Sequence, residues 1–142
     1  MKVTRRTCMR KVQVLADDTA VVSHAGSALL VELADRLGLT DGLGVAMAPT
    51  RERRSAHDPG RVLCDVAVML ASGGDCLSDL GALRDQVDLF GRVASDSTAF
   101  RVIDSVDGEC LERIRAARAS ARERARAAGA RQRSSWISTP PS

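Results

Sequence analysis

Aromatic residues are scarce in this chain of 142 residues, where they make up 2% of the composition. They are Phe90, Phe100 and Trp136, and no tyrosine occurs. This scarcity argues against a protein that binds single-stranded nucleic acid, because such proteins stack the bases on aromatic side chains. It also argues against a large β-sandwich or barrel, since strands of these folds favour aromatic residues.

Long apolar runs are also missing, because no stretch of 18 consecutive apolar residues occurs. Their absence excludes a transmembrane helix. The first 18 residues are basic but hold no apolar segment of the kind that a secretory signal requires. We therefore expect a cytoplasmic protein with no membrane partner. The hydrophobic content of 44% is enough for one buried core.

Metal-binding and catalytic motifs are absent as well. The chain has four cysteines but no CxxC pair, and neither of its two histidines stands at a zinc-finger spacing from them. The phosphate-binding patterns GxGxxG and GxxxxGK(S/T) do not occur, and neither do HExxH and GxSxG. We expect reduced thiols, no metal site and no cofactor, and the residues alone do not indicate an enzyme.

The charge is unevenly distributed although the net charge is only +3. Residues 1–16 carry five bases and no acid, residues 62–112 carry ten acids against three bases, and residues 113–142 carry eight arginines and one glutamate. This pattern is typical of a protein whose two basic ends bind a polyanion at two places. Contacts between one part of the protein and another would explain it equally well. Of the 21 bases, 19 are arginine, which suits phosphate binding, although codon usage in a GC-rich genome gives the same excess.

Hydrophobic periodicity predicts a mainly α fold, a small helical domain with a short N-terminal β-hairpin and a long C-terminal Arg-rich helix. Two β-branched runs predict the hairpin over residues 12–23. The expected helices cover residues 27–37, 41–48, 59–72, 75–86, 97–104 and 107–128. The helix at 59–72 is the most apolar and should be central, with Asp58 as its N-cap and Pro59 as its first residue.

Composition divides the chain into three segments. Residues 1–11 should form a flexible basic arm, residues 12–130 the folded domain, and residues 131–142 a disordered tail. Gly129 should end the long helix, and residues 87–95 should form turns.

Asp75 and Asp79 could hold a cation, but we favour capping, because the start of a helix attracts acids.

Two segments are candidates for contact with double-stranded DNA. Arginine side chains can neutralise phosphates in the polar loop before residue 62 and on the long helix. The candidate DNA-binding residues are Arg51, Arg53, Arg54, His57, Arg61, Arg118, Arg122 and Arg126. We also expect Arg113 on the exposed basic surface of the long helix. A simple solvated helix face is the alternative for that surface.

Four stretches between residues 20 and 130 carry a resemblance to a known family. They are VVSHAGSALLVELADRLGL, HDPGRVLCDVAVMLASGGDCLSDLGALRDQVDLFG, VASDSTAFRVID and LERIRAARASARERARAAGA. The chain resembles the N-terminal domain of group-one DDE transposases of bacterial insertion sequences. The resemblance implies a mainly helical region that precedes an RNase H-like core, in which an acidic triad holds two Mg²⁺ ions. No acid of this chain matches a triad position, so no catalytic residue is carried over.

The last nine residues suggest why the catalytic motif is missing. One synonymous codon set for residues 134–142, TCG TCC TGG ATC TCG ACG CCA CCC TCG, can be read one nucleotide earlier. After one undetermined residue, that frame encodes Val-Leu-Asp-Leu-Asp-Ala-Thr-Leu, which matches the first catalytic motif implied by the resemblance. We hypothesise a frameshift near residue 133, and sequencing the gene would test it.

The sequence therefore predicts a truncated transposase, the DNA-binding or assembly domain for transposition of an insertion sequence, catalytically inactive alone. Its expected partners are the terminal repeats of the element, as double-stranded DNA, and a full-length transposase or a second copy of the chain. The alternative is a stand-alone helical protein-interaction module without a DNA role.

Overall fold

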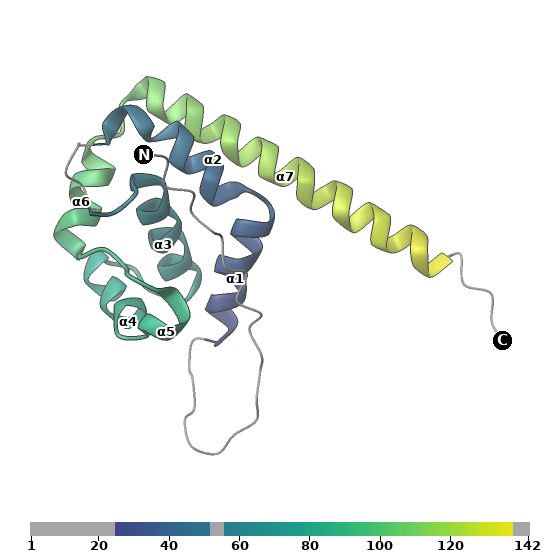
Figure 1. Cartoon of the computed structure of the whole chain (residues 1–142), viewed down its shortest axis with the longest axis horizontal. Helices are drawn as coiled ribbons and strands as arrows, with labels where there is room; N and C mark the ends of the chain where they lie inside the picture. The colour runs from purple at the N-terminus through teal and green to yellow at the C-terminus, as the bar shows by residue number, and fades with distance from the viewer. Residues whose placement is uncertain (1–24, 52–55, 138–142) are drawn as a thin grey trace, which may run out of the picture.

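The computed structural model describes residues 25–51 and 56–137, with side chains described for 26–51 and 56–130. In these ranges the chain is mainly α-helical, as predicted, and holds no strand (Figure 1). The predicted arm at 1–11 and hairpin at 12–23 lie outside the described residues. The elements are α1 (Ala25–Arg36), α2 (Leu39–Ala46), the 3-10 turn η1 (Ala48–Thr50), α3 (Pro59–Ala71), the 3-10 turn η2 (Leu77–Asp79), α4 (Leu80–Arg84), α5 (Val87–Phe90), α6 (Asp96–Asp104) and α7 (Gly108–Ile137). No described helix is both long enough and apolar enough to cross a membrane.

Helix α3 begins where the sequence predicts. The Asp58 side chain accepts hydrogen bonds from the backbone N–H groups of Gly60 and Arg61, at 3.0 and 3.2 Å. Pro59 follows as the first helical residue, where its missing N–H costs nothing. Helices α1, α2, α4 and α6 all pack against α3 (Figure 1). The prediction of a central helix is therefore confirmed.

The hydrophobic core lies around α3. Its largest fully buried members include Val62 of α3 and Leu80 and Leu83 of α4. Phe90 of α5 and Ala99 of α6 belong to the same core cluster. Fully burying a side chain of this size contributes on the order of 2 kcal/mol to the free energy of folding. Short helices from the middle of the chain thus hold together by packing on one long apolar helix.

Helices α2 and α3 touch through their backbones. An ideal Cβ placed on Gly60 of α3 would lie 2.2 Å from the nitrogen of Gly44 and 2.5 Å from its Cα. Only a residue without a side chain allows this approach. Gly60 therefore sets how closely α2 can lie on α3.

Two predictions for the middle of the chain are wrong. The single helix expected over 75–86 is a 3-10 turn followed by the five-residue helix α4. The Asp79 side chain accepts hydrogen bonds from the backbone N–H groups of Asp75 and Cys76, which tightens the start of this segment. The turn expected over 87–95 contains helix α5, which ends at Gly91 with a positive φ of 72°.

The predicted end of the long helix is also wrong. Helix α7 begins after Asp107, as predicted, because the Asp107 side chain accepts a hydrogen bond of 2.7 Å from the backbone N–H of Cys110. It continues through Gly129 to Ile137, so residues 131–137 of the expected tail are helical. A glycine within a helix costs about 1 kcal/mol relative to alanine. The alanines and arginines around it are strong helix formers and outweigh this cost.

Helix α7 lies along α2 and then leaves the body of the protein (Figure 1). Cys110 and Ala121 are buried in this seam, and Ala117 faces Gly42 so closely that a Cβ on Gly42 would lie 3.2 Å from the Ala117 Cβ. Arg124 closes the seam by donating hydrogen bonds to the carbonyl oxygens of Leu37, at 2.6 Å, and of Gly38, at 3.3 Å. Small residues in the seam therefore let α7 rest directly on α2.

Candidate nucleic-acid interface

The candidate residues of the loop before α3 are only partly described. Arg53 and Arg54 lie outside the described residues. Arg51 is exposed and forms an ion pair with Asp58, with 3.4 Å between its Nη1 and the Asp58 Oδ2. His57 is half-buried in the bend that precedes α3. The loop therefore places Arg51 next to an acid that also caps α3.

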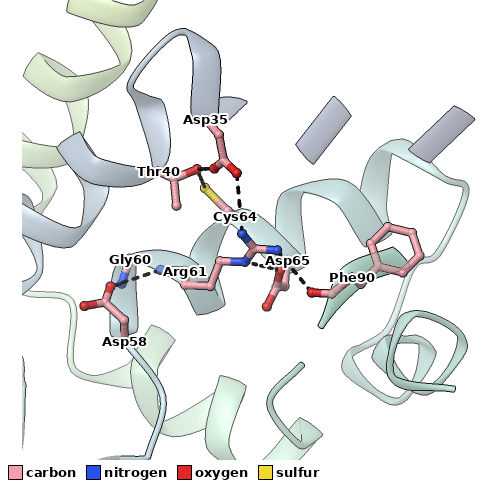
Figure 2. Close-up of polar contacts among 8 residues, drawn as sticks. All are labelled: Asp35, Thr40, Asp58, Gly60, Arg61, Cys64, Asp65 and Phe90. Atoms are coloured by element: carbon pink, nitrogen blue, oxygen red, sulfur yellow. Dashed lines mark hydrogen bonds and ion pairs between the residues drawn. The ribbon is translucent and has the colours of Figure 1, made fainter. Parts of the chain in front are cut away.

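Arg61 is half-buried, and its guanidinium is engaged by other parts of the fold (Figure 2). Its Nε donates to Asp65 at 3.0 Å, and its Nη2 donates to the Phe90 carbonyl oxygen at 3.2 Å. Its Nη1 lies 3.9 Å from a carboxylate oxygen of Asp35. We call Arg61, Asp65, Asp35 and Phe90 the Arg61 clamp. Because the clamp joins α1, α3 and α5 and occupies the guanidinium, this geometry favours a structural role for Arg61.

Asp65 is the buried acid of the clamp, with 3% of its surface exposed. Burial raises its pKa to about 6, and the neighbouring Arg61 only partly opposes this effect. Burial also raises the pKa of the Cys64 thiol, which donates weakly to the Thr40 hydroxyl at 3.6 Å. Sequence reasoning missed Asp65, although its spacing of four residues from Arg61 is typical of an ion pair within a helix.

A pocket of about 810 Å³ opens beside the Arg61 clamp. Its charged lining residues are Asp35, Asp41, Asp58, Arg61 and Arg92. With more acids than bases, the pocket does not favour a phosphate group. The Thr40 hydroxyl in this lining donates a hydrogen bond of 2.5 Å to the Asp35 carboxylate, which in turn faces Arg61.

The candidate residues on α7 share one side of that helix. With 3.6 residues per turn, residues three or four apart lie on the same side. The stripe consists of Arg115, Arg118, Arg122 and Arg126, and we call it the arginine stripe. All of its members are exposed. Arg115 joins the predicted residues because it lies three residues before Arg118.

The arginine stripe is only partly neutralised. Arg115 forms an ion pair with Glu112, and Arg126 lies 3.7 Å from Glu123. Arg118 and Arg122 have no hydrogen-bond or ion-pair partner in the part of the chain that the structure describes. Such surface ion pairs are weak, at about 0–1 kcal/mol, so an anion could readily replace the glutamates.

Arg113 does not belong to the exposed surface, so that prediction is wrong. Its Nε donates a hydrogen bond of 3.0 Å to the Ala46 carbonyl oxygen at the end of α2. Position 113 falls on the side of α7 that packs on α2, four residues before Ala117. A cation is favourable there, because the carbonyl end of a helix carries partial negative charge.

Of the two acids for which we predicted capping, Asp79 caps the start of the η2 segment. Asp75, Cys76 and Asp79 bring their side-chain ligand atoms within 4.8 Å of one another. The Asp79 carboxylate already accepts two backbone N–H groups, and these hydrogen bonds lower its pKa. Capping therefore gives the Asp79 carboxylate a structural role.

Comparison with known families connects the fold to transposition. The family described as "Transposase DDE domain group 1" matches residues 4–137. Because this match spans most of the sequence, the chain belongs to that transposase family. Membership implies a role related to transposition, and with it interaction with DNA in general. No curated protein and no solved structure matches the chain.

Proposed function

We propose that this chain is a DNA-binding and assembly region for transposition of an insertion sequence, and that the arginine stripe of α7 binds the phosphates of duplex DNA. The terminal repeats of the element are the proposed target. One observation carries the proposal: the stripe gathers four exposed arginines on one side of a helix, and two of them lack partners among the described residues. Exposed, unpaired guanidinium groups are suited to paired hydrogen bonds with phosphate oxygens.

The charge arrangement on α7 supports a polyanion more than plain solvation. A solvated helix face usually mixes both signs of charge along its length. Here Glu112 and Glu123 pair with Arg115 and Arg126 at the two ends of the stripe, whereas Arg118 and Arg122 between them have no acid partner among the described residues. The rise of 1.5 Å per residue spaces the arginines about 5 to 6 Å apart along the axis. That repeat allows several phosphates to be contacted at once.

The apolar content of α7 argues against a coiled coil. Between Arg115 and Ala130, no apolar side chain is larger than alanine. Coiled coils need large apolar residues that repeat every 3.5 positions. The exposed part of this helix therefore suits an electrostatic partner.

The proposal is tested by salt titration of binding to a short duplex DNA. When the logarithm of the binding constant is plotted against the logarithm of the salt concentration, the line falls with a slope of about 0.9 for each phosphate that the protein neutralises. The double variant Arg118→Ala with Arg122→Ala should therefore weaken binding and lower that slope by about 1.8.

The matched control is the double variant Arg84→Ala with Arg92→Ala. These exposed arginines also lack a partner among the described residues but lie outside α7. The control removes the same charge and should leave the slope near that of the unaltered chain. Equal slopes for both double variants, or no DNA binding at low salt, would refute the proposal.

A second candidate function, protein interaction, is favoured by α1. Leu29, Leu30 and Leu33 are 50%, 41% and 51% exposed and lie within two helical turns. Exposed leucines grouped in this way are typical of a protein-binding surface. If sedimentation finds self-association that Leu30→Gln with Leu33→Gln abolishes, while DNA binding is absent, this second function replaces the first.

A further inference from the structure

Two arginines of α7 bind the carboxyl ends of two other helices, and we call Arg113 and Arg124 the anchor arginines. The Arg113 Nε donates a hydrogen bond of 3.0 Å to the Ala46 carbonyl oxygen, where α2 ends. Arg124 donates to the carbonyl oxygens of Leu37 and Gly38, directly after the end of α1, at 2.6 and 3.3 Å. Carbonyl groups at the end of a helix lack partners within it and carry partial negative charge, so arginine suits both places.

Apolar packing contributes little to the seam between α2 and α7, which lie side by side (Figure 1). Among the described side chains of α7, those that are buried belong to Cys110 and Ala121, which are both small. A pocket of about 560 Å³ lies between the two helices, and both anchor arginines line it. Hydrophobic stabilisation grows with the apolar area that is buried. The anchor arginines therefore account for much of the attachment of α7.

The anchor arginines and the arginine stripe lie on opposite sides of α7. Nine residues make two and a half turns of a helix, so side chains nine positions apart point in opposite directions. Arg122 lies nine positions after Arg113, and Arg115 lies nine positions before Arg124. When the anchor arginines reach the ends of α1 and α2, the stripe therefore points away from those helices.

The direction of the stripe matters because the rest of the fold is acidic. Residues 62–107, which precede α7, carry eight aspartates against three arginines, and we call them the acidic segment. Asp41 also lines the pocket between α2 and α7. Phosphates are repelled by these carboxylates, and the repulsion weakens with distance. A duplex bound on the outer side of α7 is kept away from them by the helix itself.

We infer that Arg113 and Arg124 are positioning residues, which fix the rotation of α7 on α2 so that duplex DNA binds on the side of α7 that faces away from α2. This inference rests on the proposed function and adds the direction from which DNA is bound. The anchor arginines act through the stripe and do not contact phosphates. Backbone carbonyl oxygens and, for Arg113, the Glu109 carboxylate accept their hydrogen bonds.

The first experiment compares Arg124→Met, Arg124→Lys and Arg122→Met in salt titrations of binding to a short duplex. Arg122→Met removes a phosphate contact and should lower the slope by about 0.9. Arg124→Met should weaken binding roughly tenfold at one salt concentration but leave the slope unchanged, because the stripe is less well positioned. Arg124→Lys keeps a cation at the end of α1 and should restore most of the affinity. A slope lowered by about 0.9 in Arg124→Met would show direct phosphate contact and overturn the inference, while the proposed function would stand.

The second experiment reads the rotation of α7 directly in the unaltered fold. A photoreactive amino acid is placed at position 119 or at position 120, and cross-linking to bound duplex DNA is measured. Ala119 lies four residues after Arg115 and three before Arg122, on the side of the stripe, whereas Ser120 lines the pocket beside α2. Position 119 should cross-link several times more strongly than position 120, and Arg124→Met should reduce this difference. Equal cross-linking from both positions without Arg124→Met would overturn the inference alone, and absence of DNA binding by the unaltered chain would overturn the proposed function as well.

Discussion

The buried carboxylate of Asp65 predicts an unusual dependence of stability on pH. Its pKa of about 6 in the folded chain stands well above the ordinary value of 3.8. Because each unit of pKa difference corresponds to about 1.36 kcal/mol, the ionised Asp65 costs the fold on the order of 3 kcal/mol. The cause is burial, since only 3% of this residue is exposed and Arg61 neutralises it incompletely.

The sign follows from the raised pKa. The folded chain binds the Asp65 proton more tightly than the unfolded chain does, so this group adds stability at low pH. The contribution is fully present below pH 3.8 and is lost as the pH rises through about 6. The variant Asp65→Asn keeps the shape and the acceptor for Arg61 but carries no charge. Its free energy of unfolding should equal that of the unaltered chain at low pH and exceed it by about 3 kcal/mol near neutral pH.

The measurement is urea unfolding followed by far-ultraviolet circular dichroism, from about pH 4 to about pH 8. The difference between the two chains is plotted against pH, so that all other titrating groups cancel. The control for the loss of one negative charge is Asp104→Asn. Asp104 is exposed and has no ion-pair partner among the described residues. A flat difference curve for Asp65→Asn would show that the Arg61 ion pair balances the cost of burial, and a variant less stable than the unaltered chain at neutral pH would show that it outweighs that cost.

The remaining predictions concern the start of α3. Gly60→Ala should lower the free energy of unfolding by about 3 kcal/mol, because the new methyl group would overlap the backbone of Gly44. Gly81→Ala, which meets only an ordinary contact at 3.7 Å, should be tolerated, and equal stability of the two variants would contradict the reasoning. Asp58→Ala should cost about 1 kcal/mol by removing the N-cap, whereas Asp58→Asn should keep most of the stability. Urea unfolding measures all four, and a fully stable Asp58→Ala chain would show that the cap contributes nothing.

Strong local signals made part of the fold predictable. The pair Asp58-Pro59 ahead of an apolar run located α3 and its central position, because capping and burial act on the same segment. Helices α4 and α5 were not predicted correctly, since helices of five and four residues have too few turns to show a periodicity. The end of α7 was missed because Gly129 weakens a helix without stopping it when good helix formers surround it.

The candidate interface was predictable to a similar extent. Spacing alone placed Arg118, Arg122 and Arg126 on one side of α7. It could not tell that Arg113 turns toward α2 or that Arg61 is enclosed by acids, because both outcomes depend on which helices pack together. The positions of these two side chains depend on tertiary packing, which a local sequence pattern does not encode.

Because of the contact between Gly42 and Ala117, a small displacement near the start of α7 becomes a larger displacement at its C-terminal end. If buried Cys110 acts as the pivot, Ala117 lies about 10 Å along the axis and Ile137 about 40 Å along it. A methyl group added at Gly42 that pushed Ala117 outward by about 1 Å would swing the far tip by about 4 Å, by simple proportion. The absence of a side chain at Gly42 therefore sets the direction in which the C-terminal end of α7 points.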